Sequence, residues 1–138
     1  MKIDYLEPEF AIADAITPED LAGIRAQGFR TVICNRQPGE DGFEDEQLFK
    51  EAATRAGLEW VSVPVSPGEY SDEDVETFGK ALEHSPSPVL GFCRTGRRAV
   101  HMWAHARAKE PSCNIPLLLK AAHAAGHDPQ PIKEMLEK

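Results

Sequence analysis

Short apolar runs alternate with amphipathic stretches along most of this chain. The runs are rich in β-branched and aromatic residues, which is typical of buried strands, and they cover residues 10–13, 30–34, 58–63 and 89–92. Between and beyond them, apolar residues recur at helical spacing and predict helices over about 18–27, 44–56, 71–84, 99–109, 115–125 and 132–138. Strands that alternate with helices indicate parallel pairing through right-handed crossovers.

Helix-start and helix-stop residues support this division. Thr17 followed by Pro18 is typical of a helix start, Ser71 followed by three acidic residues begins another helix, and Gly28 and Gly57 are helix stops. We therefore predict an α/β fold with a mainly parallel sheet of four to five strands and helices on both faces. With 138 residues, 41% of them hydrophobic, the chain is expected to form one domain over 1–138.

Three predicted loops leave the carboxyl edge of such a sheet, where parallel sheets bind their ligands. They cover residues 34–42, 64–70 and 93–98. We therefore expect all three loops to line one pocket.

Charge is distributed unevenly along the chain. The formal net charge of -8 argues against a nucleic-acid partner or an anionic membrane surface, because phosphate contacts need clustered Lys and Arg. Residues 1–93 hold 7 Lys or Arg and 19 Asp or Glu, whereas residues 94–109 hold five Lys or Arg and no acid. This local positive patch favours a small anionic substrate, and the alternative is a solvated basic helix end.

Cys93 stands at the end of the last apolar run, directly before the basic patch. A short loop and then a helical pattern follow it. Unpaired N–H groups at a helix start, together with the helix dipole, stabilise negative charge and would favour the nucleophilic thiolate of Cys93. The residues expected to bind the anion with this loop are Arg94, Thr95, Gly96 and Arg97.

The spacing from Cys93 to Arg98 is Cys-x4-Arg, with Gly96 where the backbone must curl its N–H groups inward. Tyrosine and dual-specificity phosphatases use Cys-x5-Arg, which would need arginine at position 99, but that residue is Ala99. The shorter loop is similar to that of rhodanese-type sulfurtransferases.

A phosphatase also needs a general acid, normally an aspartate after an earlier strand. Residues 63–67 hold no carboxylate, and the nearest ones, Glu69 and Asp72, come late. Sulfur transfer needs no such acid, so the sequence favours a sulfurtransferase over a cysteine phosphatase. A noncatalytic module that binds an anion or a protein is the third alternative.

Several short segments, in order from residue 6 to 108, make the chain resemble a known family. They cover residues 16–21, 28–33, 35–36, 56–58, 63–66 and 93–96. The family is the phosphatase-like domain of beta-lactamase hydrolase-like proteins, often described as a rhodanese-like sulfurtransferase. The resemblance implies a cysteine-phosphatase-like α/β fold that holds a sulfurtransferase-like loop. Some relatives are fused to a metal-dependent hydrolase, whose metal-site motif this chain lacks.

The resemblance also implies roles for individual residues. Cys93 matches the family's cysteine, Gly96 its loop glycine and Arg98 its loop arginine. The sequence departs from the pattern at Phe92, where histidine is common, and at Ala99, where serine or threonine is usual. The expected reaction is transfer of a sulfane sulfur from an anionic donor through a Cys93 persulfide, with Arg98 orienting the donor.

The remaining chemistry-bearing residues have weaker patterns. Asn35 and Arg36 follow a strand at the same edge and could provide a second anion contact, or Arg36 could be an exposed loop residue. Cys34 is more often a small buried hydrophobe than a resolving thiol for Cys93. The pairs His101/His105 and His123/His127 have helical i, i+4 spacing but no further ligand at a metal-site spacing.

Composition sets the remaining expectations. We expect no metal and no cofactor, and we take Cys113 as structural. Three widely spaced cysteines indicate reduced thiols, and no apolar segment suits a signal peptide or a membrane span, so a cytoplasmic protein is expected. The sequence leaves the oligomeric state and the sulfur donor and acceptor open.

Overall fold

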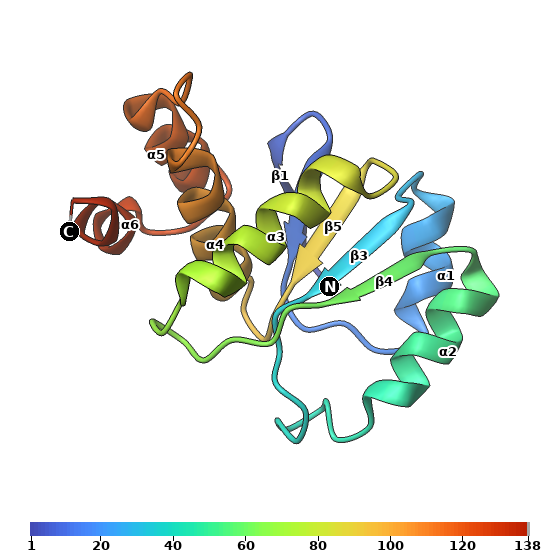
Figure 1. Ribbon diagram of the computed structural model, residues 1–138. Helices are drawn as coiled ribbons and strands as arrows, with labels where there is room; N and C mark the ends of the chain where they lie inside the picture. The colour runs from blue at the N-terminus through green and yellow to red at the C-terminus, as the bar shows by residue number, and fades with distance from the viewer. Residues whose placement is uncertain (138) are drawn as a thin grey trace.

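The computed structural model of the protein describes residues 1–137 and contains one five-stranded sheet with six helices (Figure 1). The strands are β1 (Ile3–Glu7), β2 (Phe10–Ala13), β3 (Thr31–Cys34), β4 (Glu59–Ser62) and β5 (Val89–Phe92). The helices are α1 (Asp20–Ala26), α2 (Glu46–Ala56), α3 (Asp72–His84), α4 (Arg97–Ala108), α5 (Ile115–Ala124) and α6 (Pro129–Leu136).

The sheet has the order β1-β2-β5-β3-β4. β2, β5, β3 and β4 are parallel, and β1 pairs antiparallel with β2 at one edge. The buried strand β5 therefore lies at the centre, where it delivers Cys93 to the carboxyl edge between the ends of β2 and β3 (Figure 1). The predicted fold class, a mainly parallel α/β sheet with helices on both faces, is confirmed.

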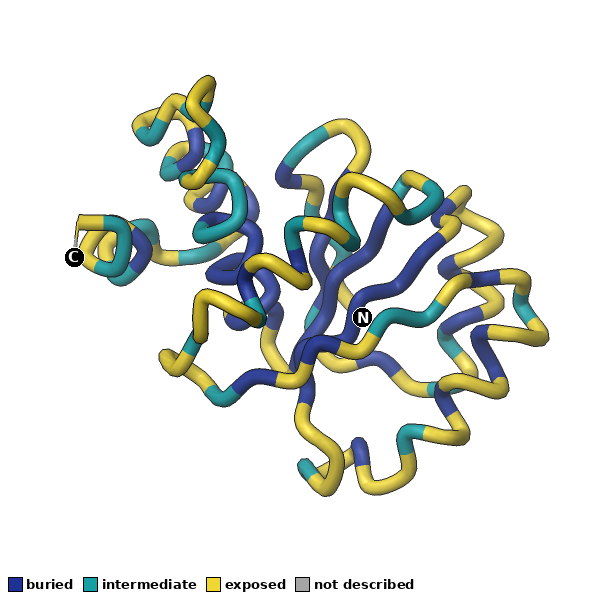
Figure 2. Tube along the Cα trace, viewed as in Figure 1, coloured by how far each residue is buried: buried dark blue, intermediate teal, exposed yellow. Residues whose placement is uncertain are grey.

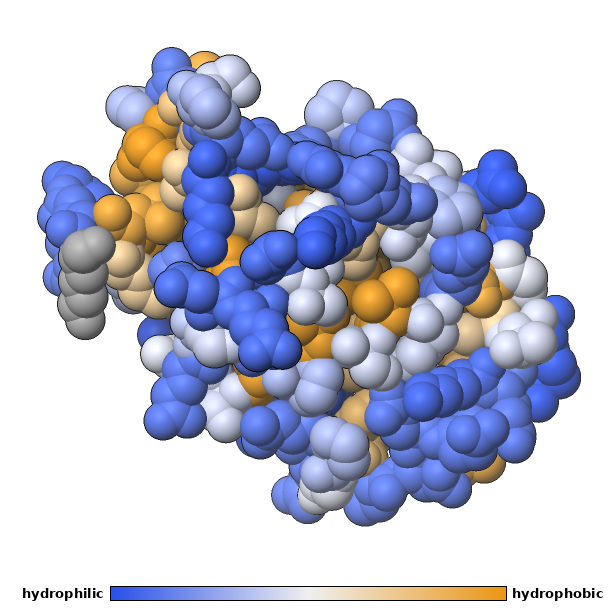
Figure 3. Space-filling model, viewed as in Figure 1, coloured by the Kyte–Doolittle hydropathy of each residue, from blue (hydrophilic) through white to orange (hydrophobic). Residues whose placement is uncertain are grey.

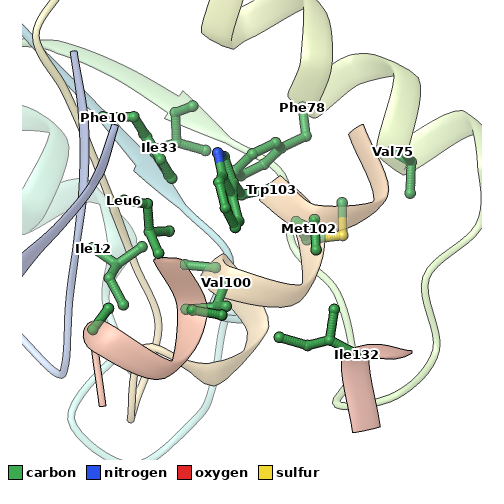
Figure 4. Close-up of a cluster of buried hydrophobic side chains, with 14 of the residues drawn as sticks. Leu6, Phe10, Ile12, Ile33, Val75, Phe78, Val100, Met102, Trp103 and Ile132 are labelled. Carbon is green, nitrogen blue, oxygen red and sulfur yellow. The ribbon is translucent and has the colours of Figure 1, made fainter. Parts of the chain in front are cut away.

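Two hydrophobic clusters cover the two faces of the sheet. α1 and α2 pack on one face around Leu21, Ile24 and Phe49. α3 and α4 pack on the other face, where Phe78, Val100 and Trp103 lie close to Phe10 and Ile33 of the sheet (Figure 4). α5 and α6 pack against α4, and Ile132 of α6 belongs to the same cluster. Figure 2 shows the central strands as the most continuously buried part of the chain, because both of their faces are covered.

Strand β1 was not predicted from the sequence. It has one buried residue, Leu6, and its other side chains are exposed or half-buried, so no apolar run marks it. A bulge between Tyr5 and Glu7 further interrupts its pairing with β2. Its place at the sheet is decided by that pairing rather than by its own pattern.

Most predicted helix ends are confirmed to within two residues. Ser71 caps α3 by accepting a hydrogen bond from Asp74 N at 3.1 Å, and Gly57 ends α2 with a φ of 82°. α1 begins at Asp20 rather than Pro18, because the Asp20 carboxylate accepts a hydrogen bond from Thr17 N and holds residues 17–19 in a preceding turn. α6 begins three residues earlier than predicted, capped by Asp128, and Lys138 lies outside the described residues.

The C-terminal helices form the least polar part of the visible surface. Figure 3 shows hydrophobic side chains gathered over α5, where a groove of about 520 Å³ lies between α5 and α6. Within residues 1–137, no helix combines the length and the apolarity that crossing a membrane requires.

Candidate active site

Cys93 lies directly after β5, at the base of the loop that leads into α4. The residue is 1% exposed, and its Sγ accepts hydrogen bonds from Gly96 N at 3.1 Å and from Arg98 N at 3.3 Å. Gly96 makes this turn possible with a φ of 89°, in the left-handed region that favours glycine. The loop therefore has the inward N–H groups that the sequence predicted.

Arg98 is the central polar residue of the site and is only 5% exposed. Its guanidinium forms a two-pronged ion pair with Glu40, with Nη1 at 2.7 Å and Nη2 at 2.8 Å from the carboxylate oxygens. The pKa of Arg98 is raised above its usual range, first by Glu40 and also by the nearby Cys93. The side chain is thus held in one orientation beside the thiol.

Glu40 is the functional residue that sequence reasoning missed. It pairs with Arg98 and also with Arg36, whose Nε lies 3.2 Å from Oε1. The hydrogen bond from Arg98 lowers the pKa of Glu40 to about 2, so the carboxylate stays charged. The i, i+4 spacing of Arg36 and Glu40 was the one available signal, but its partner Arg98 is 58 residues away along the chain.

The three predicted loops meet at Arg98. Its Nη1 donates to Asn35 O at 3.2 Å and to Val65 O at 3.0 Å, in addition to Glu40. Residues from 34–42, 64–70 and 93–98 therefore surround one guanidinium, as the sheet topology led us to expect.

Asn35 and Arg36 lie behind this arrangement. The buried Asn35 donates from Nδ2 to Val63 O at 2.8 Å and so ties two loops together, while its Oδ1 has no partner among the described residues. Arg36 is 3% exposed, and its guanidinium bonds Glu40 and Asp41 O and covers the ring of Phe43. The contacts of both side chains are structural, and their expected anion-binding role stays a prediction.

Arg94, Thr95 and Arg97 are exposed residues of the loop. Thr95 Oγ1 accepts from Arg97 N at 3.3 Å. Within residues 1–137, neither the Arg94 nor the Arg97 guanidinium has an ion pair or a hydrogen bond. The charge of Arg98 is offset by Glu40, so these two arginines carry the uncompensated positive charge of the loop.

Phe92 and Ala99, the two departures from the family pattern, are both fully buried. Phe92 packs with Phe49, Trp60 and Phe43, at ring-centroid distances of 5.7 to 6.5 Å. A histidine at position 92 would place a polar ring in this aromatic cluster. The cluster therefore gives a packing reason for phenylalanine before the nucleophile.

The half-buried Tyr70 and the buried His101 form a polar pair next to the loop. Tyr70 Oη lies 3.0 Å from His101 Nδ1, and the pKa of Tyr70 is raised mainly by burial. Burial lowers the pKa of His101 to about 4, so its imidazole is neutral at pH 7. His105 also packs against the Tyr70 ring, so the pair His101/His105 brackets a tyrosine.

The other candidates form no hydrogen bond with the Cys93 loop among the described residues, although Cys34 on β3 pairs in register with Phe92, next to Cys93. Burial raises the pKa of Cys34 to about 12, which keeps it a thiol and favours the core role over a resolving one. Cys113 is partly buried near α5. Asp72 is fully exposed and lies 3.7 Å from Lys109, and Glu69 lies in an exposed turn that bridges to Ser66. Among residues 1–137, no three His, Cys, Asp or Glu side chains gather as a metal site.

Comparison with known proteins identifies relatives over most of the chain. The family model of the beta-lactamase hydrolase-like protein, phosphatase-like domain, matches residues 2–110. A beta-lactamase hydrolase-like protein from Xylella fastidiosa (strain Temecula1) is 28% identical over 132 residues, which cover 93% of this chain. The chain spans 30% of the length of that curated relative.

Solved structures agree on the fold. A candidate phosphatase from Neisseria meningitidis Z2491 has a TM-score of 0.87 and 31% identity, with 99% of this chain and 97% of that chain covered. Tk-PTP in its active form has a TM-score of 0.74 at 13% identity, covering 98% and 95%. Kinase associated phosphatase, with its catalytic-site cysteine replaced by serine, has a TM-score of 0.69 at 12% identity, covering 93% and 85%. The last two similarities concern the fold.

Proposed function

This chain belongs to the family of the phosphatase-like domain of beta-lactamase hydrolase-like proteins, and we propose that it is a cysteine-dependent phosphatase of small anionic substrates. The observation that carries the proposal is the Cys93 Sγ, which accepts two backbone hydrogen bonds beside a guanidinium fixed by Glu40. Backbone N–H groups directed at the sulfur, next to a fixed guanidinium, suit a sulfur nucleophile and the phosphoryl oxygens of the group whose phosphorus it attacks. The fold shared with cysteine phosphatases supports the same reaction class.

The proposed reaction has two steps. The Cys93 thiolate attacks phosphorus, an S–P bond forms, and the P–O bond to the leaving group breaks with its electron pair on oxygen. Water then attacks the cysteinyl phosphate, which releases inorganic phosphate and restores the thiolate. In both steps the loop N–H groups and Arg98 stabilise the equatorial oxygens of the phosphoryl group.

The loop at 64–70 limits the substrates of this reaction. Glu69 is exposed and Asp72 pairs with Lys109, and neither carboxylate forms a hydrogen bond or ion pair with the Cys93 loop among the described residues. An alkyl alkoxide is a poor leaving group without a proton donor, whereas a phenolate or a phosphate is stable when charged. We therefore expect aryl phosphates and phosphoanhydrides to react faster than alkyl phosphates.

Sulfur transfer remains the second candidate. It is favoured by the Cys-x4-Arg spacing and by the same lack of a nearby acid. In this reaction the thiolate attacks the outer sulfur of thiosulfate, sulfite leaves with the electron pair, and cyanide removes the sulfur as thiocyanate. The relatives described above support phosphatase chemistry more directly than this reaction, which was predicted from the loop spacing and the missing acid.

Parallel assays separate the two functions. We expect hydrolysis of p-nitrophenyl phosphate by the wild-type chain and a loss of at least about a thousandfold in Cys93→Ser, because the nucleophile is removed. Thiosulfate:cyanide transfer is measured on the same two samples, and Cys113→Ser serves as the matched control. Thiocyanate formation without phosphate ester hydrolysis would replace the phosphatase with the sulfurtransferase. If neither assay showed turnover that depends on Cys93, the chain would be a noncatalytic anion-binding module.

A further inference from the structure

A second cavity adjoins the Cys93 loop at Arg97. It has a volume of about 220 Å³ and lies between the first turn of α4 and the start of α6. Its lining residues are Arg97, His101, Gly126, His127, Asp128 and Pro131. The reaction proposed above uses none of these side chains.

Arg97 links this cavity to the Cys93 loop. The backbone N–H groups of its two neighbours, Gly96 and Arg98, donate to Cys93 Sγ, while the Arg97 side chain lines the cavity. Within residues 1–137, the Arg97 guanidinium is paired with no carboxylate. An arginine at the wall of a cavity that has no carboxylate partner can bind an anionic oxygen of a ligand.

The two histidines offer neutral donors at the same cavity. His101 is 4% exposed and its Nδ1 lies 3.0 Å from the Tyr70 hydroxyl, whereas its Nε2 has no hydrogen-bond partner among the described residues. When Tyr70 donates to Nδ1, Nε2 carries the ring proton and can donate to a ligand. His127 packs directly against Gly96, since a Cβ built there would lie 3.3 Å from His127 Nε2.

One acidic residue also lines the cavity. Asp128 is exposed, and its Oδ1 is occupied as the cap of α6 by accepting a hydrogen bond from Gln130 N at 3.0 Å. Arg97 and the two histidines therefore give the cavity more hydrogen-bond donors than Asp128 gives it acceptors, and the cavity favours an anion over a cation.

We propose that this cavity is a second anion subsite, which takes a further phosphate group of the substrate while the Cys93 loop holds the first. The substrate class is then a small molecule with two linked phosphate groups, and this inference rests on the phosphatase proposed above. A phosphate leaving group also fits a site without a nearby general acid. Arg97 and His101 lie within the matched family region 2–110, whereas the wall formed by residues 126–131 lies beyond it, so the cavity forms only where the C-terminal part of the chain meets α4.

The test measures binding rather than turnover. Isothermal titration calorimetry on the full chain with Cys93→Ser compares inorganic phosphate, pyrophosphate and tripolyphosphate. We expect pyrophosphate or tripolyphosphate to bind at least about tenfold more tightly than phosphate, as an added charge-assisted arginine contact allows. Equal affinities for the three anions, or no binding of any, would overturn the subsite.

Matched variants locate the preference. Arg97→Ala should remove most of the preference for pyrophosphate and tripolyphosphate over phosphate. Arg94→Ala removes the same charge from the same loop but outside the cavity, so it should weaken the binding of all three anions alike. His127→Ala should reduce the preference and His123→Ala, on exposed α5 surface, should not. If Arg97→Ala and Arg94→Ala lowered the affinities for the three anions equally, general charge attraction would explain the binding and the subsite would be overturned.

The two proposals can fail separately. A preference for pyrophosphate in Cys93→Ser together with an inactive wild-type chain would reject the phosphatase and keep the subsite. Hydrolysis of p-nitrophenyl phosphate without any such preference would reject the subsite and keep the phosphatase.

Discussion

At the residue scale, the shape of the Cys93 loop depends on Gly96. Its φ of 89° is costly for any residue with a Cβ, and its N–H group is one of the two that reach Cys93 Sγ. The space around it is also limited, because a Cβ there would lie 3.4 Å from Ala13 O and 3.3 Å from His127 Nε2. One glycine therefore serves both the backbone turn and the contact with the C-terminal segment.

Gly96→Ala should lower the free energy of unfolding by about 1–2 kcal/mol, the cost of the left-handed conformation. It should also reduce Cys93-dependent turnover, because the loop must shift to relieve the contacts. The control is Gly28→Ala, which has a φ of 104° but no atom within 4 Å of the added Cβ. Denaturant unfolding should show a loss in both variants and activity assays a loss in Gly96→Ala alone; an active Gly96→Ala enzyme would contradict the loop's role.

Glu40 shows how one residue can set the orientation of another. Arg98 is buried and could turn toward several carbonyl oxygens, but two oxygens of one carboxylate match the two ends of its guanidinium. The orientation of Arg98 beside Cys93 thus depends on a residue from a different loop.

At the element scale, the close packing of β2 against β5 positions the nucleophile. Phe10 and Val89 begin this parallel pair, and it ends at Ala13 and Phe92, one residue before Cys93. Gly91 lies in the middle, where a Cβ would be only 2.9 Å from the Cζ of Phe10. Phe10 is itself 1% exposed, so its ring has little room to move.

Gly91→Ala should therefore destabilise the protein by about 1–3 kcal/mol through overpacking. The double variant Gly91→Ala/Phe10→Leu should be more stable than the sum of the two single changes predicts, because leucine lacks the ring atom that clashes. Denaturant unfolding of the four proteins in this cycle measures the coupling. Strict additivity of the two changes would show that the β2–β5 contact is not the cause.

At the scale of the whole molecule, Arg98 holds the three loops of the site together across the carboxyl edge, through its ion pair with Glu40 and its hydrogen bonds to Asn35 O and Val65 O. Glu40 is the residue through which this arrangement responds to pH, because its pKa falls from an ordinary 4.5 to about 2 in the folded chain. A depressed carboxyl pKa stabilises the folded state fully above pH 4.5, and the contribution is lost as the pH falls toward 2.

Glu40→Gln should lower the free energy of unfolding by about 2 kcal/mol at pH 7, since Arg98 loses its charged partner in a largely buried site. The difference from wild type should stay constant above pH 5 and shrink between pH 4.5 and 2, where Glu40 is protonated in the unfolded chain. The control is Glu44→Gln, which removes a charge from the same segment without touching Arg98. Parallel pH curves for wild type and Glu40→Gln would contradict the assignment.

The sequence by itself determined the elements that carry their own signal. Apolar runs marked β2 to β5, capping residues marked α2 and α3, and the order of strands and helices predicted the sheet edge where Cys93 lies. Cys93, Gly96 and Arg98 were identified because a nucleophile, a positive-φ glycine and an arginine stand within six residues. Local spacing is enough for such features because they depend on neighbours along the chain.

Only the tertiary structure decided the contacts between distant segments. β1 lacks an apolar run and is placed by its partner β2, and Glu40 gains its role from an arginine 58 residues away. Arg36 turned out to be buried behind Glu40 rather than exposed, and His127 reaches the Cys93 loop from beyond α5. The chemistry of a side chain is known from the sequence, but packing decides which charged groups pair. Within residues 1–137, packing pairs Arg98 with Glu40 and leaves Arg97 without a carboxylate partner.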